Sequence, residues 1–316
     1  MLEYFERVER NGSGVSSFSP IERIPIDNTG LYLQWQHQLL PSVNTIIGVR
    51  QDSHSINPTE ISSKFGIIWT AFDNVTIKLL SGESFQSPTV QLWYRDAVQA
   101  GDIIGNEELR PQNAKTEELI LNWKINPYTK LDTTLFKTKI TDLVVFKGDF
   151  VNLFAENSRQ SDAYGVEVEL KYQQQGWSGY INYSYHHTDI SRDETSLFVL
   201  EYRQHGELMP EHIVNSGLSY LSDSKQWLAS LEHKYISTRL ASSQNVLLAQ
   251  QFYQLDSYHH TNMLFKYFIN LSGDKATNIQ LKVKNLFDNR YVHPGFGGID
   301  YPNLGRSVEL SFHREF

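Results

Sequence analysis

The sequence predicts an all-β fold, an antiparallel up-and-down meander that forms a portion of a transmembrane β-barrel. Apolar and polar residues alternate along about fourteen segments, short and long connections alternate between the segments, and Trp residues gather near the short connections. The final segment shows the alternation clearly, with one face formed by Val308, Leu310, Phe312 and Phe316 and the other by Glu309, Ser311, His313 and Glu315. Lipid-facing and lumen-facing residues alternate in this way in membrane barrels.

The earlier segments repeat this pattern from residue 31 onward. Their apolar rows are centred on 31–35, 43–49, 65–69, 75–79, 119–123, 166–172, 177–185, 214–220, 227–235, 263–267 and 279–283. The alternate positions carry charged residues, among them Glu167, Glu169, Lys234 and Lys282. The dry core of a soluble sandwich does not accommodate so many charges, whereas a water-filled lumen does.

The connections between segments alternate in length. Short ones are expected near 40–41, 72–73, 126–127, 174–175, 222–223 and 273–274, and long ones at 9–29, 51–59, 83–113, 147–160, 188–210, 238–255 and 288–304. Outer-membrane barrels have short periplasmic turns and long extracellular loops, so we expect the long connections on the outside, with 83–113 the longest. A periplasmic girdle near the short turns is predicted for Trp35, Trp69, Trp123, Trp177 and Trp227.

Composition is consistent with this class and excludes others. The chain has no Cys, so it has neither disulfides nor thiol chemistry, and its net charge of -8 argues against a nucleic-acid-binding surface. Aromatic residues make up 13%, yet the mean hydropathy is only -0.41, as expected when alternate residues alone touch lipid. Residues 1–10 lack the pattern of a signal peptide, so we expect a mature chain or a fragment.

Several motifs resemble one family. The stretch NLFDNRY at 285–291, followed by a loop and by PNLGR at 302–306, resembles the C-terminal end of TonB-dependent outer-membrane receptors. Residues 31–55 and 64–94 resemble the middle barrel strands of that family. FQSP at 85–88 stands where these receptors often have F-R-A-P, and NEELRP at 106–111 stands where N-P-x-L-x-P occurs.

The resemblance implies a barrel of about 22 strands in the outer membrane of a Gram-negative cell, with a plug in its lumen. Residues 1–316 would be the C-terminal portion of such a barrel without a plug domain, and the chain alone is not expected to transport. The implied ligand is a scarce nutrient chelate, preferentially a ferric siderophore, with haem and cobalamin as alternatives. The implied partners are outer-membrane lipid, the barrel-assembly machinery and, through the plug and box upstream, the TonB complex. No cofactor and no nucleic acid is expected.

Aromatic and cationic residues of the long connections are the candidate ligand contacts, because they stack on and hydrogen-bond to anionic, aromatic chelates. They are Trp93, Tyr94, Arg95, Tyr202, Arg203, Phe252, Tyr253, Tyr291, His293 and Tyr301. Haem receptors of the family place an axial His between the two loop motifs. No His lies between Phe85 and Leu109, and Gln86 stands at the Arg position, so haem is not favoured.

Neither a metal site nor an enzyme is predicted. The pairs 186–187 and 259–260 are adjacent His residues on strands, where neighbouring side chains point to opposite faces, so neither pair can chelate one ion. His205 with Glu201 and Glu207 could bind a cation in a solvated loop, although a simple loop is the preferred interpretation. The acidic residues, His and Ser of the 188–210 connection lack the spacing of a hydrolase.

Two alternatives remain at this level. An open sheet edge in lipid leaves backbone groups unpaired at several kcal/mol each, so further strands complete the barrel or these strands close on themselves. The second option gives a passive fourteen-stranded channel, which is possible because outer-membrane barrels have an even number of strands. A soluble β-sandwich is disfavoured by the charged face and by the girdle.

The C-terminal aromatic generates the first prediction. Phe312 and Phe316 resemble the terminal signal read by the barrel-assembly machinery. Deleting Phe316 from the full-length receptor should lower its amount in the outer membrane without changing ligand affinity in correctly folded copies. Quantitative immunoblotting of outer-membrane fractions measures the amount. Unchanged assembly would count against this role of Phe316.

Overall fold

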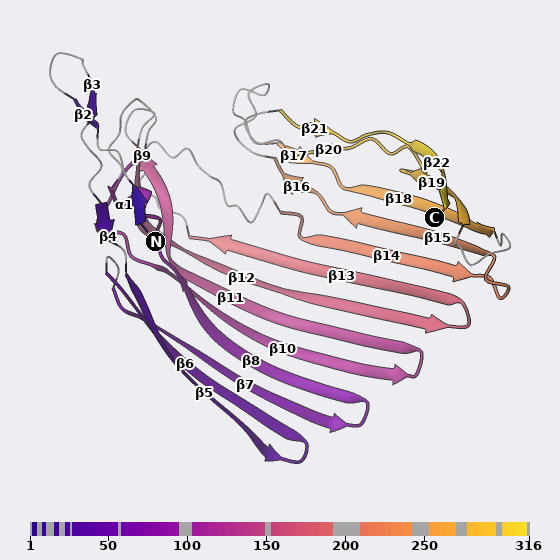
Figure 1. Cartoon of the computed structure of the whole chain (residues 1–316), viewed down its shortest axis with the longest axis horizontal. Helices are drawn as coiled ribbons and strands as arrows, with labels where there is room; N and C mark the ends of the chain where they lie inside the picture. Colours follow the sequence, from indigo (N-terminus) through magenta and orange to yellow (C-terminus); the bar gives the residue numbers. More distant parts are fainter. Residues whose placement is uncertain are drawn as a thin grey trace.

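The computed structural model describes residues 2–4, 8–10, 16–18, 23–25, 27–55, 58–94, 103–148, 153–191, 209–241, 253–269, 277–294 and 299–314. Among them is a curved, open sheet of 14 strands (Figure 1). Its meander runs, in chain order, through β5 (Asn28–Leu40), β6 (Val43–His54), β7 (Glu60–Phe72), β8 (Val75–Gln86), β10 (Gln112–Asn126), β11 (Thr129–Gly148), β12 (Leu153–Gln174), β13 (Trp177–Ile190), β14 (His212–Leu221), β15 (Trp227–Ile236), β18 (Tyr258–Ile269), β19 (Thr277–Lys284) and β22 (Ser307–Arg314).

The remaining elements are short. The connection between β8 and β10 contains helix α1 (Val90–Tyr94) and β9 (Ile103–Ile104), and β9 pairs in parallel with β12. Near the N-terminus β1 (Leu2–Tyr4) pairs with β4 (Arg23–Pro25), and β2 (Val8–Arg10) pairs with β3 (Ser16–Phe18), apart from the large sheet. No helix in the described ranges is long and apolar enough to span a membrane.

The pairing register keeps apolar side chains together on one face. One row of opposed residues crosses six strands through Ile77, Leu121, Thr133, Val168, Tyr183 and Val214. A second row crosses the last strands through Leu218, Leu231, Met263, Val283 and Val308. Many other side chains of the same face are exposed, Leu119, Leu135 and Leu310 among them, which suits a face turned towards lipid.

Polar side chains form matching rows on the opposite face. One of them crosses seven strands through Asn122, Asp132, Glu169, Asn182, Asn215, Lys234 and His260. Within this face the Asn122 amide donates to Asp132 at 2.6 Å, and Lys171 bonds to Glu169 at 2.6 Å. The predicted division into an apolar and a polar face is therefore confirmed across the whole sheet.

Two-residue turns join strands at one edge of the sheet. They are the turns 41–42, 73–74, 127–128 and 175–176, and Figure 1 shows these hairpin ends along the same side. In the last of them Gln175 and Gly176 have φ values of 47° and 80°, the left-handed pair that matches the twist of two-residue hairpins. The long connections lie at the other edge, and 87–111 is the longest of those between consecutive meander strands.

The predicted girdle follows this short-turn edge. Trp35, Trp69, Trp123 and Trp177 are 52%, 46%, 37% and 44% exposed, and Trp227 is half-buried. The Trp177 and Tyr220 rings are tilted against each other at 38° with their centroids 4.6 Å apart, and Tyr220 contacts Trp227 edge-on at 5.4 Å. None of the five lies in a closed core, as expected for aromatic residues at the boundary between lipid and water.

Some details of the sequence prediction were wrong. The long connection expected at 147–160 is mostly strand, because β11 and β12 continue to pair as far as Gly148 and Leu153. The register shifts between Ile140 and Leu143, next to Asp142 with its φ of 55°. This bulge interrupts the alternation of apolar and polar residues, so the sequence pattern does not show that the strands continue. The strand Leu2–Tyr4 does not belong to the large sheet, and β9 departs from the predicted antiparallel meander because it pairs in parallel with β12.

The ends of the sheet bear on closure. In the described structure β5 pairs only with β6 and β22 only with β19, at opposite ends of the sheet. The alternative in which the strands close on themselves is therefore not the arrangement observed. Among the described residues, one side of each of these two strands has no strand partner.

Neighbouring residues of β11 test the assignment of the two faces. Leu135 lies on the apolar face and Thr134 on the polar face, opposite Glu167. Leu135→Arg should destabilise the membrane-inserted barrel by about 2–4 kcal/mol, whereas Thr134→Arg should have little effect. Urea unfolding of the protein in lipid vesicles measures both. Equal destabilisation by the two substitutions would show that the faces are assigned incorrectly.

Candidate ligand-binding site

The candidate site lies at the edge of the sheet opposite the short turns. The connection after β15 contains β16 (Arg239–Leu240) and β17 (Gln254–Leu255), which pair with each other. The connection after β19 contains β20 (Val292–His293) and β21 (Tyr301–Pro302), which also pair. Figure 1 shows these four short strands near the same end of the sheet, close to the start of β18.

The turn after β19 is built around Asn285, which is 1% exposed and has a φ of 51°. Its side-chain oxygen accepts from the N–H of Asn289 at 3.0 Å, and its amide donates to the Asn289 carbonyl at 2.9 Å. Its own N–H donates to Oδ1 of Asn262 at 3.1 Å. Asn tolerates the left-handed backbone and bonds to it locally, so this residue sets the direction in which the chain leaves β19.

The two C-terminal motifs join in that turn. Oδ1 of Asp288 accepts from the N–H of Arg306 at 2.7 Å. A Cβ at residue 305 would lie 2.9 Å from the same oxygen, so the close approach requires Gly305. NLFDNRY and PNLGR are thus two sides of one hydrogen-bonded turn, and this turn positions Tyr291 and β20.

Four rings meet beyond the turn. The rings of Tyr258 and Tyr291 are stacked with centroids 3.7 Å apart and an angle of 4°. His293 lies perpendicular to both, at 6.0 Å from Tyr258 and 5.3 Å from Tyr291. The Tyr291 hydroxyl is hydrogen-bonded to Nδ1 of His260 at 3.1 Å. Together with Arg239 we call these residues the outer aromatic cluster.

Arg239 anchors the cluster from β16. Its guanidinium carbon lies 5.7 Å from the centre of the Tyr258 ring, and Nη2 donates to the carbonyl of Val292 at 3.3 Å. Arg239 is only 7% exposed, and its Nη1 has no hydrogen-bond partner in the described part of the chain. The cation–π contact compensates part of the cost of burying this charge.

Burial shapes the titration of the cluster. It lowers the pKa of His293 below 6.5, and the positive charges of Arg239, Lys234 and His260 lower that pKa further. Burial raises the pKa of the Tyr291 phenol. Both side chains are therefore neutral at pH 7, beside the permanent charge of Arg239, and the cluster offers stacking faces, hydrogen-bond donors and one cation.

The structure brings together four of the ten residues predicted to contact a ligand. Tyr291 and His293 belong to the cluster, and Tyr301 lies opposite His293 in the β20–β21 pair with 58% of its surface exposed. The Tyr253 hydroxyl donates to the carboxylate of Asp300, next to Tyr301, so the two connections are joined there as well.

Trp93 has a different environment from these four. It is 3% exposed and packs with Leu109 and Ala155, and its Nε1 donates to the carbonyl of Leu109 at 3.2 Å. In this position Trp93 holds the 87–111 connection on β11 and β12, and its contact with a ligand remains a prediction. Tyr94 ends α1, and nothing is described of its side chain, while Arg95, Tyr202, Arg203 and Phe252 lie outside the described residues.

The remaining sequence predictions concern the C-terminus and the His residues. Phe312 is 64% exposed on the apolar face of β22, and Phe316 lies outside the described residues. The register places His259 opposite Tyr235 on the apolar face and His260 opposite Lys234 on the polar face, as predicted. The described residues contain no group of three or more His, Cys, Asp or Glu that could hold a metal ion, and residues 201–207 lie outside them.

Sequence reasoning missed Arg239, Tyr258 and His260 as partners of the predicted residues. Arg239 lies in a connection with no motif of its own, and Tyr258 and His260 read as ordinary members of a strand. The one available signal was that β18 follows one long connection and is the neighbour of β19, which leads into the last one, so the outer end of β18 had to lie between them. That signal predicts that these residues lie near one another, but it does not predict which side chains touch.

The sequence matches the family described as TonB dependent receptor-like, beta-barrel, over residues 3–286. The chain belongs to this family. No curated protein matches it significantly in sequence.

Solved structures show the same fold at low sequence identity. The FrpB iron transporter from Neisseria meningitidis is 15% identical with a TM-score of 0.70, and the match covers 90% of this chain and 44% of that protein. The siderophore receptor PirA from Acinetobacter baumannii is 17% identical with a TM-score of 0.70, covering 91% and 45%. The ferripyoverdine receptor of Pseudomonas aeruginosa is 15% identical with a TM-score of 0.67, covering 94% and 39%.

The chain thus spans less than half the length of each of these receptors. Family membership places it in the outer membrane of a Gram-negative cell. The short-turn edge is then periplasmic, and the outer aromatic cluster lies on the extracellular side.

The lowered pKa of His293 generates a pH prediction. In the unfolded segment His293 binds a proton near pH 6.5, whereas in the folded segment its pKa is lower. The contribution of neutral His293 to the stability of the folded segment is therefore complete above pH 6.5 and is lost as the pH falls through 6.5 towards the folded pKa. Hydrogen exchange of residues 285–306, corrected for the intrinsic pH effect, should show falling protection below pH 6.5. His293→Gln should remove this dependence, and the β10–β11 turn should not show it. A pH-independent segment in the unsubstituted protein would contradict the assigned environment.

Proposed function

We propose that this chain is the C-terminal barrel portion of a TonB-dependent receptor that takes up a scarce nutrient chelate, with a ferric siderophore as the ligand. The observation that supports this most is the outer aromatic cluster at the extracellular end of a barrel sheet. His293 of this cluster and the adjacent Tyr301 are exposed and offer a face for stacking and donors for hydrogen bonds, and Arg239 adds positive charge. Such groups suit anionic, partly aromatic iron chelates.

The unpaired edges of the sheet support the proposal that this chain is part of a larger barrel. Since β5 and β22 each have one unpaired side in the described structure, they need partners in a membrane, where unsatisfied backbone groups cost several kcal/mol each. We propose that further strands of the same receptor pair with them and close the barrel. A plug in the lumen would then face the polar rows, and the TonB complex would act through that plug, as the family resemblance implies.

The ligand stays the least constrained part of the proposal. Two of the similar structures are described as siderophore or ferripyoverdine receptors and one as an iron transporter, and these descriptions concern those proteins. Cobalamin and haem are the alternatives within the family. The passive channel has no specific support, because it would require β5 to pair with β22.

Uptake of labelled chelates tests the function. Cells that carry the receptor as their only one should accumulate iron-55 from at least one ferric siderophore, and removing TonB should abolish the uptake. Tyr301→Ala and His293→Ala should each raise the half-saturating concentration about tenfold, equivalent to about 1.4 kcal/mol.

Phe287→Ala provides the matched control for these substitutions. Phe287 is an aromatic residue of the same connection, 67% exposed and outside the cluster, so its loss should leave uptake unchanged. Equal effects of all three substitutions would remove the cluster from ligand binding. Uptake of cobalamin or haem and of none of the iron chelates would replace the siderophore as the ligand.

A further inference from the structure

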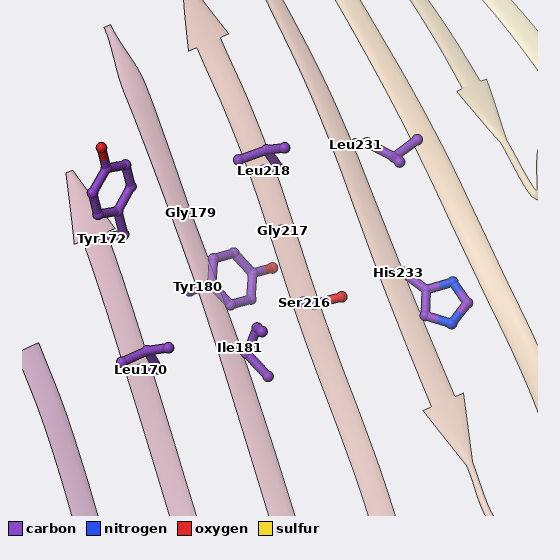
Figure 2. Close-up of a pocket in the computed structure, with 10 residues that line it drawn as sticks. All are labelled: Leu170, Tyr172, Gly179, Tyr180, Ile181, Ser216, Gly217, Leu218, Leu231 and His233. Atoms are coloured by element: carbon purple, nitrogen blue, oxygen red, sulfur yellow. The ribbon is translucent and has the colours of Figure 1, made fainter. Parts of the chain in front are cut away.

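The apolar face of the sheet is not smooth. Two neighbouring rows of opposed residues run through Tyr172, Gly179, Leu218 and Leu231, and through Leu170, Ile181, Ser216 and His233. Gly179 in the first row and Ser216 in the second are the smallest members and are diagonal neighbours on β13 and β14. They leave a trough of about 340 Å³, whose lining residues are shown in Figure 2.

The trough has apolar walls and crosses the four strands from β12 to β15. Leu170 and Ile181 lie on one side of it, and Leu218 and Leu231 lie on the other. Tyr172 lies at the β12 end, and its hydroxyl donates to Gln174 at 3.0 Å. Trp177 and Tyr220 lie two residues nearer the short turns than Gly179 and Leu218, with their ring centroids 4.6 Å apart.

His233 forms the other end. Its Nδ1 is hydrogen-bonded to Thr261 at 2.8 Å and its Nε2 to His259 at 3.1 Å. Both ring nitrogens thus have hydrogen-bond partners within the sheet, and these bonds fix the orientation of the imidazole. This imidazole bounds the trough on β15.

The position of the trough along the strands places it in one leaflet. Its two rows meet β13 at Gly179 and Ile181, three and five residues after the short turn at 175–176. Five residues span about 17 Å along a strand, and a tilt of roughly 45° reduces this to about 12 Å across the membrane, less than half of a hydrocarbon core of about 30 Å. Because the short turns are periplasmic, the trough lies in the periplasmic half of the membrane.

We infer that the trough is a binding site for one acyl chain of a phospholipid from the periplasmic leaflet, with its headgroup at the aromatic girdle. Lipid is the medium against this face, so an occupant with a hydrocarbon chain is always present. A chain in the trough touches protein on three sides instead of one, and dispersion contacts rise accordingly. An empty trough would leave its walls without partner atoms. The site therefore retains its lipid longer than the flat face beside it does.

Filling the trough tests the inference. Ser216→Leu puts a side chain into it and keeps the face apolar, so the barrel should still fold. Thr133→Leu is the matched control, a small-to-large change on the same face of β11, away from the trough. The protein is used at its native length, extracted in mild detergent and analysed by native mass spectrometry.

The unsubstituted protein and Thr133→Leu should each retain one phospholipid per copy, and Ser216→Leu should lower the retained fraction at least fivefold. In vesicles of palmitoyl-oleoyl phosphatidylethanolamine that contain a phospholipid with a diazirine on its acyl chain, cross-links should map to residues 170–181 and 216–231. Uptake of the chelate should be unchanged in both variants, which separates this test from that of the proposed function.

Several results would overturn the inference. These are the absence of retained phospholipid, equal retention by Ser216→Leu and Thr133→Leu, or cross-links confined to other strands. Retention of lipopolysaccharide instead of phospholipid would place the site in the wrong leaflet. A dimer whose contact covers the trough would show that a second copy is the occupant.

Discussion

The register of the antiparallel pairs is the constraint on which the rest of the structure depends. A shift of one residue in any pair would move every apolar side chain of a strand to the opposite face, because successive side chains alternate. The observed register joins Ile77, Leu121 and Thr133 on one face and Asn122, Asp132 and Glu169 on the other. Two-residue turns at 41–42, 73–74, 127–128 and 175–176 hold this register at one edge. The opposite edge is thereby free to carry long connections, and the candidate site is built there.

The candidate site shows how short motifs act through contacts that are distant in sequence. Asn285 and Asp288 shape the turn after β19, and Asp288 binds the N–H of Arg306, at the start of the final strand. This turn delivers Tyr291 to Tyr258, on the neighbouring β18. Arg239 arrives from a third segment and closes the group by its bond to Val292. The geometry of the cluster thus depends on a hydrogen-bonded frame built from residues far apart in the sequence.

The two faces have different consequences for function. The polar rows present charge and amides to a lumen, which suits a plugged or water-filled interior. The apolar rows face lipid, and their small members, Gly179 and Ser216, turn a general contact with the membrane into a shaped one. His233 breaks the apolar row at little cost, because Thr261 and His259 satisfy both of its nitrogens. A polar residue on a lipid-facing surface is thus accommodated within the sheet.

The sequence by itself determined the fold class, the two faces, the short turns and the girdle, because each depends on a local rule. Alternation along a strand reports its faces, and turn residues report its ends. The resemblance of NLFDNRY and PNLGR also indicated the family. Only the tertiary structure decided that Trp93 is buried against Leu109 and Ala155, that β9 pairs in parallel with β12, and that β11 and β12 run on past a bulge at Asp142. It also decided that Arg239, Tyr258 and His260 join Tyr291. These features arise between segments far apart in the chain, where the partner of a residue is selected by packing in space and leaves no period in the sequence.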